Sequence, residues 1–188
     1  MHIDAHLNCI NHLLVAGAQI NSEKKNRTIL MVAASKGYLE FVQDILEREA
    51  WVNHMDNDGK TALHYAIDTK GENHDVVKAL ISYDANMNIQ TSSDGITPLM
   101  FAVNRGHRMI AQTLIAKGCN LINNEFINMN TALHMACMKG EREIVECIAN
   151  ETTFHDVFNL KNKQGQTPLD IAQERVMEMQ TKKMSGQM

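Results

Sequence analysis

Histidine and cysteine are the side chains of this chain that could bind a metal, so their spacing is considered first. His2 and His6 have the i, i+4 spacing of two metal ligands on a helix, but the sequence supplies no third ligand nearby. Cys137 and Cys147 lie on either side of a turn, with His134 close before Cys137, whereas zinc sites use closely spaced cysteine pairs that recur. The favoured interpretation is free thiols that fill the core, with no metal site.

Motifs for nucleophilic catalysis and for phosphate binding are missing as well. The sequence has no Gly-x-Ser-x-Gly elbow, no cysteine in an activating context and no glycine-rich phosphate loop. We therefore predict that the protein is not an enzyme and needs no cofactor.

The composition is that of a folded protein whose small net charge creates no strong electrostatic field. The chain has 188 residues, 44% of them hydrophobic, and a formal net charge of -4, so nothing in the overall charge favours nucleic acid or an anionic membrane. Four cysteines without disulfide-type spacing indicate a reducing compartment, so we expect the cytosol or the nucleus. The sequence also lacks a secretory leader pattern and a long apolar run, so no membrane insertion is predicted.

A Thr-Xaa-Leu motif recurs along the chain, each time with an alanine three residues after the leucine. Its threonines stand at positions 28, 61, 97, 131 and 167, which are 33, 36, 34 and 36 residues apart. A period in this range indicates one supersecondary unit that is copied and stacked into a solenoid. The five alanines leave room for neighbouring helices to approach closely; they are Ala33, Ala66, Ala102, Ala136 and Ala172.

Each repeat is predicted to contain two short helices. In residues 91–124, Pro98 begins the first helix, Gly106 ends it, and the second helix stops before Gly118. Isolated helices need about 12–15 residues to form in water, so these helices depend on stacking. Methionines at helix positions, such as Met31, Met100, Met109 and Met135, are expected to fill the core.

These repeats resemble the ankyrin repeat over about residues 5–175. The resemblance is carried by Gly-Ile-Thr-Pro-Leu at 95–99, Thr-Ala-Leu-His at 61–64 and 131–134, and Asp-Ala-Asn-Met-Asn at 84–88. It implies an all-α solenoid whose repeats each contribute a β-turn finger and two helices, with a concave face lined by fingers and first helices. It also implies that His64 and His134 are structural, bonded to the motif threonine and to neighbouring backbone.

The expected domain is an ankyrin repeat domain over residues 1–180, with a disordered tail at 181–188. A partial repeat at 1–21 precedes repeats at about 22–55, 56–90, 91–125 and 126–161, and a capping repeat closes the domain at 162–180. The start inside a repeat is interpreted as an excerpt of a longer protein, with an abbreviated cap at 1–5 as the alternative. Asn26 and Met129 replace the usual turn glycine and Ile122 the usual asparagine, so irregular fingers are expected before Thr28 and Thr131.

The resemblance places partner binding on the fingers and on the ends of the first helices, where sister repeats differ most. The predicted binding residues are the basic Lys24, Lys25, Arg27, Lys36, Lys60, Arg105 and Lys139, the polar Asp68 and Asn104, the apolar Ile96, Ile127 and Met138, and Trp51 in a turn. This set favours a protein or peptide partner with acidic residues around an apolar anchor. The alternative is an ordinary solvated face, and Trp51 is either exposed or packed against the neighbouring loop.

The function predicted from these features is a non-catalytic protein–protein interaction module. A regulatory or substrate-recruiting domain of a larger enzyme or channel is the first alternative. Binding of nucleic acid or a small ligand ranks third, because only 5% of the residues are aromatic.

Overall fold

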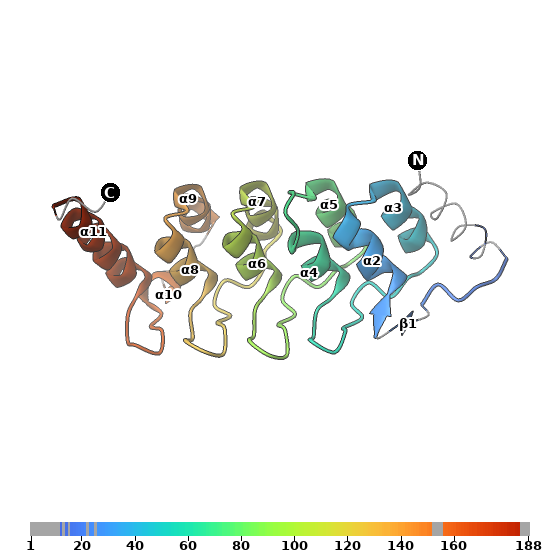
Figure 1. Ribbon diagram of the computed structural model, residues 1–188, viewed down its shortest axis with the longest axis horizontal. Helices are drawn as coiled ribbons and strands as arrows, with labels where there is room; N and C mark the ends of the chain where they lie inside the picture. Colours follow the sequence, from blue (N-terminus) through green and yellow to red (C-terminus); the bar gives the residue numbers. More distant parts are fainter. Residues whose placement is uncertain are drawn as a thin grey trace. The chain divides into compact units, whose positions relative to one another are not determined.

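The structure, a computed structural model, describes residues 12, 14, 16–21, 23, 24, 26–151 and 156–184. It consists of two compact units, Met1–Asn86 and Met87–Met188, and each is built from helix pairs joined by short turns (Figure 1). Some predictions concern residues outside the described part of the chain. These are the predictions for His2, His6 and Lys25, for most of the partial repeat and for the final residues 185–188.

The first unit contains two helix pairs and a short hairpin. Strand β1 (Glu23–Lys24) pairs antiparallel with β2 (Arg27–Thr28), directly before the helix pair α2 (Ile29–Lys36) and α3 (Leu39–Glu47). The second pair is α4 (Ala62–Ile67) and α5 (His74–Ser82). Helix α2 packs against α4 and α3 packs against α5, so first helices stack on first helices and second on second.

The second unit repeats this arrangement. Its first helices are α6 (Pro98–Arg105), α8 (Ala132–Lys139) and α11 (Pro168–Met184), and its second helices are α7 (Arg108–Ala116) and α9 (Arg142–Glu151), with the short α10 (Asp156–Asn159) before α11. The loops before α6, α8 and α11 project to the same side of this unit (Figure 1). We call these loops, at 91–96, 125–130 and 162–166, the finger row.

Helix α11 differs from the predicted cap. It continues to Met184, beyond the predicted end of the capping repeat at residue 180, so the segment 181–184 is helical rather than disordered. Its surface also carries exposed apolar side chains, because Leu169, Val176 and Met179 are 64%, 54% and 68% exposed.

The motif threonines begin the first helices because their side chains satisfy free N–H groups. Thr28, Thr97 and Thr131 accept hydrogen bonds from the N–H groups three residues later at 3.3, 3.2 and 3.4 Å. Glycines in the left-handed conformation end three of these helices; they are Gly37, Gly106 and Gly140, with φ of 73°, 71° and 72°. Local chemistry thus sets both ends of these helices.

The motif alanines lie in the core, as predicted. Ala33, Ala66, Ala102 and Ala136 are at most 2% exposed, and only Ala172 on α11 is half-buried. Close approach of the first helices is therefore confirmed within each unit, for α2 with α4 and for α6 with α8.

The methionine prediction is correct only in part. Met31 and Met100 are buried at 0% and 1% exposure and Met135 is half-buried, but Met109 is 54% exposed and was wrongly assigned to the core. In the sister second helices, the residue at its position, the second of the helix, is the acidic Glu40, Asp75 or Glu143, so its helix face is the solvent face.

The two fingers that lack a turn glycine keep the turn conformation. Asn26 and Met129 have φ of 57° and 58°, close to the 75° and 71° of Gly59 and Gly95 in the neighbouring fingers. Among the described residues these two fingers also carry the strand-like pairing, β1 with β2 before α2 and a single bridge from Asn124 to Thr131 before α8. The fingers before Thr28 and Thr131 therefore differ from the others by their strand-like pairing, and they have not lost the turn.

The predicted bond of each motif histidine to its motif threonine is confirmed, and the predicted bond to neighbouring backbone is confirmed for His134. His64 Nδ1 lies 3.1 Å from the Thr61 nitrogen, and His134 Nδ1 lies 3.2 Å from the Thr131 nitrogen, so each ring accepts the N–H group of the cap residue. His134 Nε2 also lies 3.1 Å from the Gln166 carbonyl oxygen, in the finger of the next repeat. The His134 ring thereby joins two repeats and is neutral, with its proton on Nε2.

Mild acid should destabilise the protein through His134. Burial lowers the pKa of His134, and the carbonyl groups of Gln166 and Leu160, which raise it, do not compensate. Below about pH 6.5 the imidazole of His134 takes up a proton more readily in the unfolded chain than in the folded protein. The free energy of unfolding should therefore fall as the pH drops through that value. Urea unfolding at pH 7.5, 6.5 and 5.5 measures this fall, and His134→Gln should show a smaller one. An equal fall in both proteins would contradict the assignment.

Candidate partner-binding surfaces

A polar side chain at the base of the fingers before α4, α6, α8 and α11 holds each of these loops in a turn. Asp56 Oδ1 accepts the N–H groups of Asp58 and Lys60 at 3.0 and 2.8 Å, and Asn162 closes the finger before α11 in the same way. In the finger before α6, Thr91 Oγ1 accepts the N–H group that precedes Thr97, at 2.8 Å. These bonds fix the backbone of each finger before any partner binds.

Glu125 performs this role in the finger before α8. Its carboxylate, 6% exposed, accepts the N–H groups of Ile127, Asn128 and Asn130 at 2.7, 3.0 and 3.2 Å and the Asn130 side-chain amide at 3.1 Å. Burial by itself raises the pKa of Glu125, but these backbone donors outweigh it and lower the pKa below the ordinary value. The finger is therefore organised around a buried, ionised carboxylate.

Hydrogen bonds also connect the fingers within the row. The Phe126 N–H group donates to the Asp94 carbonyl oxygen at 2.8 Å, and the Lys163 N–H group donates to the Asn128 carbonyl oxygen at 2.8 Å. The Phe126 ring covers Gly95 so closely that a methyl group there would stand 2.5 Å from a ring carbon. The three fingers thus support one another, and Gly95 is required by both its φ and this contact.

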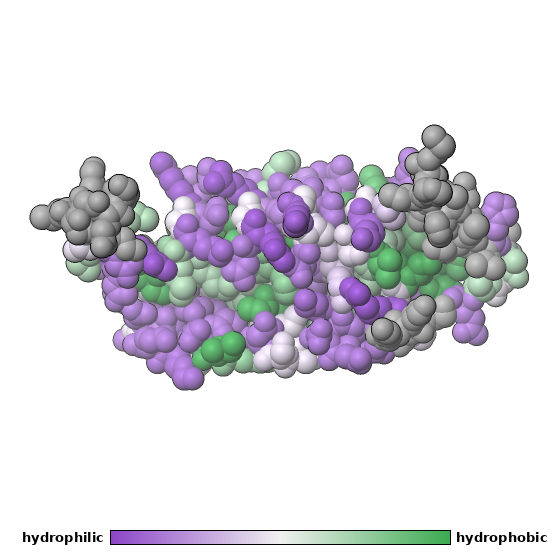
Figure 2. All heavy atoms as spheres, viewed as in Figure 1, coloured by the Kyte–Doolittle hydropathy of each residue, from purple (hydrophilic) through white to green (hydrophobic). Residues whose placement is uncertain are grey.

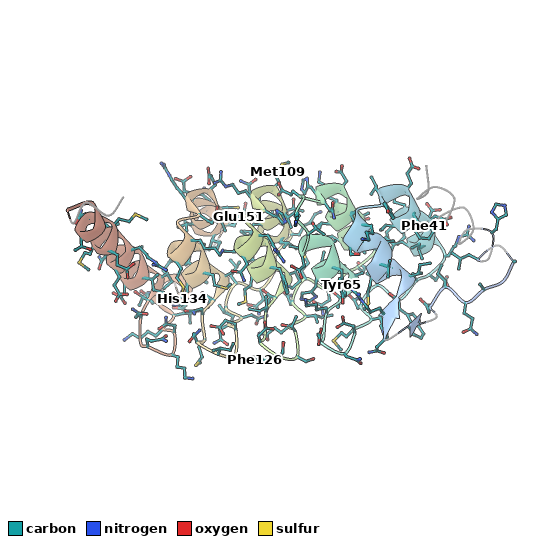
Figure 3. All side chains as sticks on the ribbon, in the orientation of Figure 1. Phe41, Tyr65, Met109, Phe126, His134 and Glu151 are labelled. Carbon is teal, nitrogen blue, oxygen red and sulfur yellow. The ribbon has the colours of Figure 1, made fainter. Side chains whose placement is uncertain are left out.

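The middle finger of the row exposes large apolar side chains. Phe126, Ile127 and Met129 are 57%, 60% and 46% exposed. Figure 2 shows hydrophobic atoms at the finger tip near α8, surrounded by hydrophilic ones, and Figure 3 shows Phe126 at the end of the unit away from its helices. Sequence reasoning identified Ile127 but missed Phe126, although sister fingers have polar residues in its place.

The predicted basic residues of this unit lie at the ends of first helices. Arg105 and Lys139 are the exposed last residues of α6 and α8, where a cation interacts favourably with the helix dipole. Lys139 Nζ donates to the Asn104 carbonyl oxygen at 3.0 Å, so the structure brings these two predicted residues together. Met138 is half-buried beside them.

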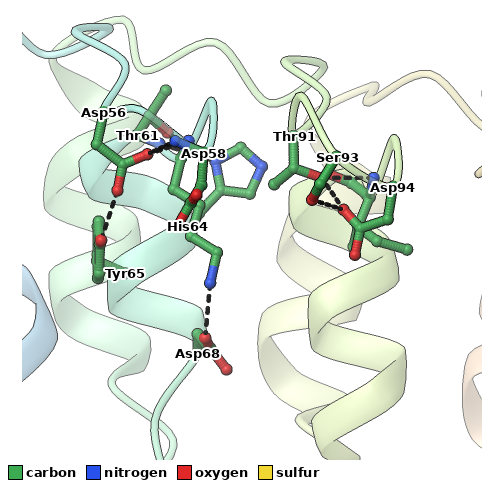
Figure 4. A network of polar contacts seen from close by, with 11 residues as sticks. Asp56, Asp58, Thr61, His64, Tyr65, Asp68, Thr91, Ser93 and Asp94 are labelled. Atoms are coloured by element: carbon green, nitrogen blue, oxygen red, sulfur yellow. Dashed lines mark hydrogen bonds and ion pairs between the residues drawn. The ribbon is translucent and has the colours of Figure 1, made fainter.

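In the first unit, three predicted residues gather around Tyr65, which sequence reasoning missed. The Arg27 guanidinium lies 4.3 Å from the Tyr65 ring centre, and Lys60 forms an ion pair with Asp68 at 3.4 Å. The Tyr65 hydroxyl donates to Asp56 Oδ2 at 2.5 Å (Figure 4). Burial, with help from Asp56, raises the pKa of Tyr65 to about 12. These cations already have anionic or aromatic partners within the unit.

A family model of ankyrin repeats matches residues 1–91, 53–124, 69–153 and 99–179. This chain belongs to the ankyrin repeat family. Ankyrin repeats are a general protein–protein interaction module, and the family is generally not catalytic.

Several characterised relatives carry the same repeats. The chain is 32% identical to the ankyrin repeat and KH domain-containing protein mask-1 of Caenorhabditis elegans over 117 residues, 62% of this chain and 4% of that protein. It is 26% identical over 139 residues to an IkB-like protein of African swine fever virus, 69% of this chain and 57% of the viral protein. It is 33% identical over 109 residues to mouse ankyrin repeat and SAM domain-containing protein 6, 58% of this chain and 12% of the relative. The chain therefore matches less than two thirds of the length of each.

The remaining predicted residues of this ankyrin chain are spread over its surface. Trp51 is 54% exposed, and its ring stacks on that of His54 with centres 5.6 Å apart, so both earlier interpretations hold in part. Lys36 is the exposed last residue of α2, and Ile96 is half-buried in the finger before α6. Lys24 belongs to β1.

The described part of this ankyrin chain holds neither a metal-type cluster nor a membrane-type helix. Within those residues no three His, Cys, Asp or Glu side chains come together to hold a metal ion. Over the same ranges, no helix has both the length and the apolar character to cross a membrane.

Proposed function

We propose that this ankyrin domain binds a partner protein through the middle finger of the finger row and catalyses no reaction. The observation that carries the proposal is an apolar patch of Phe126, Ile127 and Met129 on a backbone that Glu125 and two neighbouring fingers hold in place. An exposed apolar patch with a polar surround is typical of an interaction site. Because the loop is already ordered, a partner that binds it loses little free energy to ordering the loop.

The charges near the patch suggest what the partner carries. Lys163 Nζ donates to the Ile127 carbonyl oxygen at 3.2 Å, which places an exposed cation against the patch. Arg105 and Lys139 add exposed cations at the ends of α6 and α8 in the same unit. The partner we propose is a protein segment with an apolar anchor for the patch and acidic residues for the cations.

Peptide selection tests this proposal. Random peptides displayed on phage and selected against the domain should converge on a large apolar residue flanked by Asp or Glu. Ile127→Asp should weaken the selected peptide at least about tenfold, because it places a carboxylate in the patch and opposite the acidic flanks. Met109→Asp, on an exposed methionine of α7, is the matched control and should bind normally. Equal binding by Ile127→Asp would exclude this finger.

A regulatory or recruiting domain within a larger protein is the second candidate. The names of two relatives join ankyrin repeats to a KH domain and to a SAM domain, and the chain covers only 4% and 12% of their lengths. In that case the same finger would hold a substrate or a neighbouring domain. The complete coding sequence decides between the two candidates, because only the second requires a catalytic or channel domain in the same chain.

We place this contact in the cytosol or the nucleus. The proposal is supported by Cys119, Cys137 and Cys147, the described cysteines, all of which are free thiols.

A further inference from the structure

Asparagine side chains bridge successive repeats in the loops after the second helices. In the first unit, Asn53 Oδ1 accepts the Asn86 N–H group at 2.7 Å, and Asn53 Nδ2 donates to the Asp84 carbonyl oxygen at 3.0 Å. Asn21 accepts the Trp51 N–H group at 2.8 Å in the same way. Each bridge closes the space between one loop and the next.

The series is interrupted in the second unit. Asn88 Oδ1 accepts the Asn120 N–H group at 2.7 Å, which continues the pattern. The next position in the series is Ile122, whose side chain cannot form these bonds and is 56% exposed. At this position an apolar side chain therefore stands in place of the asparagine that would form hydrogen bonds to the following repeat.

A cavity of about 670 Å³ lies at this interruption. One wall comes from the end of α7 and the loop after it, through Ile115, Cys119, Leu121 and Ile122. Burial raises the pKa of the Cys119 thiol to about 12, so this residue contributes as a neutral apolar group. The volume falls within the range of about 300–1,000 Å³ that is usual for small-molecule sites.

The opposite wall belongs to the next repeat. Val157, 2% exposed, and the half-buried Leu160 supply its apolar surface. Glu151, the last residue of α9 (Figure 3), and Asp156, the first of α10, also line the cavity and are both exposed. Among the described lining residues there is no Lys or Arg, so this part of the site combines an apolar interior with a negatively charged edge.

We propose that this cavity is a binding site for a small ligand with an apolar ring or short chain and one ammonium group. The apolar body lies against Ile122, Val157 and Leu160, where it removes apolar surface from water. The ammonium group lies at the edge, near the carboxylates of Glu151 and Asp156. This site is separate from the finger patch, and neither proposal depends on the other.

Three naphthalene probes of equal size and different charge test the site: 1-naphthylmethylamine, 1-naphthalenemethanol and 1-naphthaleneacetate. Methyl NMR titrations at pH 7 should show the Ile122 and Val157 methyl signals shifting, with the amine bound about tenfold more tightly than the alcohol and the acetate bound weakest. The surface double variant Glu151→Gln/Asp156→Asn should keep the alcohol affinity and lose the preference for the amine. Equal affinity of the folded parent protein for the three probes, or no saturable binding at millimolar concentration, would overturn the proposal.

A second pair of variants locates the binding in the cavity. Ile122→Asn places a polar amide in the apolar wall and should weaken the alcohol at least tenfold. Ile127→Asn makes the same substitution on the exposed finger isoleucine and should leave probe binding unchanged. The peptide selected by the finger should bind the Ile122→Asn protein normally, which separates failure of this site from failure of the finger proposal. Normal alcohol binding by Ile122→Asn would place the probe elsewhere and refute the site.

Discussion

Replacing Glu125 by glutamine should lower the free energy of unfolding by about 2–3 kcal/mol at pH 7. The carboxylate accepts three backbone N–H groups and one side-chain amide, and it is 6% exposed. Glutamine keeps the shape but turns one acceptor oxygen into a donor NH₂ group, which then faces donors. Urea unfolding monitored by circular dichroism measures the loss.

The matched control is Glu146→Gln, also in the second unit. Glu146 pairs with Arg142 at 2.7 Å, but its side chain is 53% exposed, so the change should stay within about 0.5 kcal/mol. Equal stability of the two variants would show that the finger does not depend on its buried carboxylate.

The Glu125 contribution should also disappear in acid. Its pKa is lower in the folded protein than in the unfolded chain, so the unfolded chain takes up the proton first as the pH falls. The stabilisation is therefore present above about pH 4.3, the ordinary glutamate value, and is lost as the pH drops through the folded pKa. The difference between the parent and Glu125→Gln should narrow over that range.

Replacing Ala102 by leucine should destabilise the second unit by about 1–3 kcal/mol. Ala102 is 0% exposed in α6, which packs against both α7 and α8, and the added atoms have no space to occupy. For a chain of this size each kcal/mol shifts the melting temperature by about 2–4 °C, so a thermal melt resolves the effect.

Gln112→Leu provides the comparison for this overpacking. Gln112 is exposed on α7 of the same unit, so the same leucine side chain should cost little there. A melting temperature of Ala102→Leu that matches the parent would contradict the assignment of this alanine to a helix junction.

The features that sequence predicted well depend on residues that act within a few positions of one another. Thr97 caps α6 through the N–H group three residues later, and Gly106 ends the same helix in the left-handed conformation. The resemblance assigned His134 a structural role, and its bond to Thr131 at the start of its own helix confirms it. Such local chemistry recurs in each repeat, so its period predicted a stacked solenoid, and the resemblance supplied the ankyrin fold.

The features that sequence missed depend on which residues meet across repeats. Tyr65 gathers Arg27 from the preceding repeat, and Phe126 covers Gly95 of the neighbouring finger. The spacing of the motif does not say which way these side chains turn. Ile122 was recognised as a departure, but the cavity beside it depends on the path of the following repeat.

The structure shows which of the candidate binding residues are accessible, and their role in binding stays a prediction. Ile127 and Lys139 lie where a partner could reach them, whereas Lys60 is engaged with Asp68. A list of variable surface positions cannot show which cations already have partners inside the fold. Our proposal therefore places partner binding on the finger row of the second unit.

The central claim, that the middle finger binds a partner, is tested most directly by amide NMR shifts of the labelled domain with the selected peptide. The account predicts the largest shifts at residues 125–130, smaller ones in the adjoining fingers at 91–96 and 162–166, and almost none in α7 and α9. Shifts centred on α7 and α9, with the finger row unchanged, would contradict it.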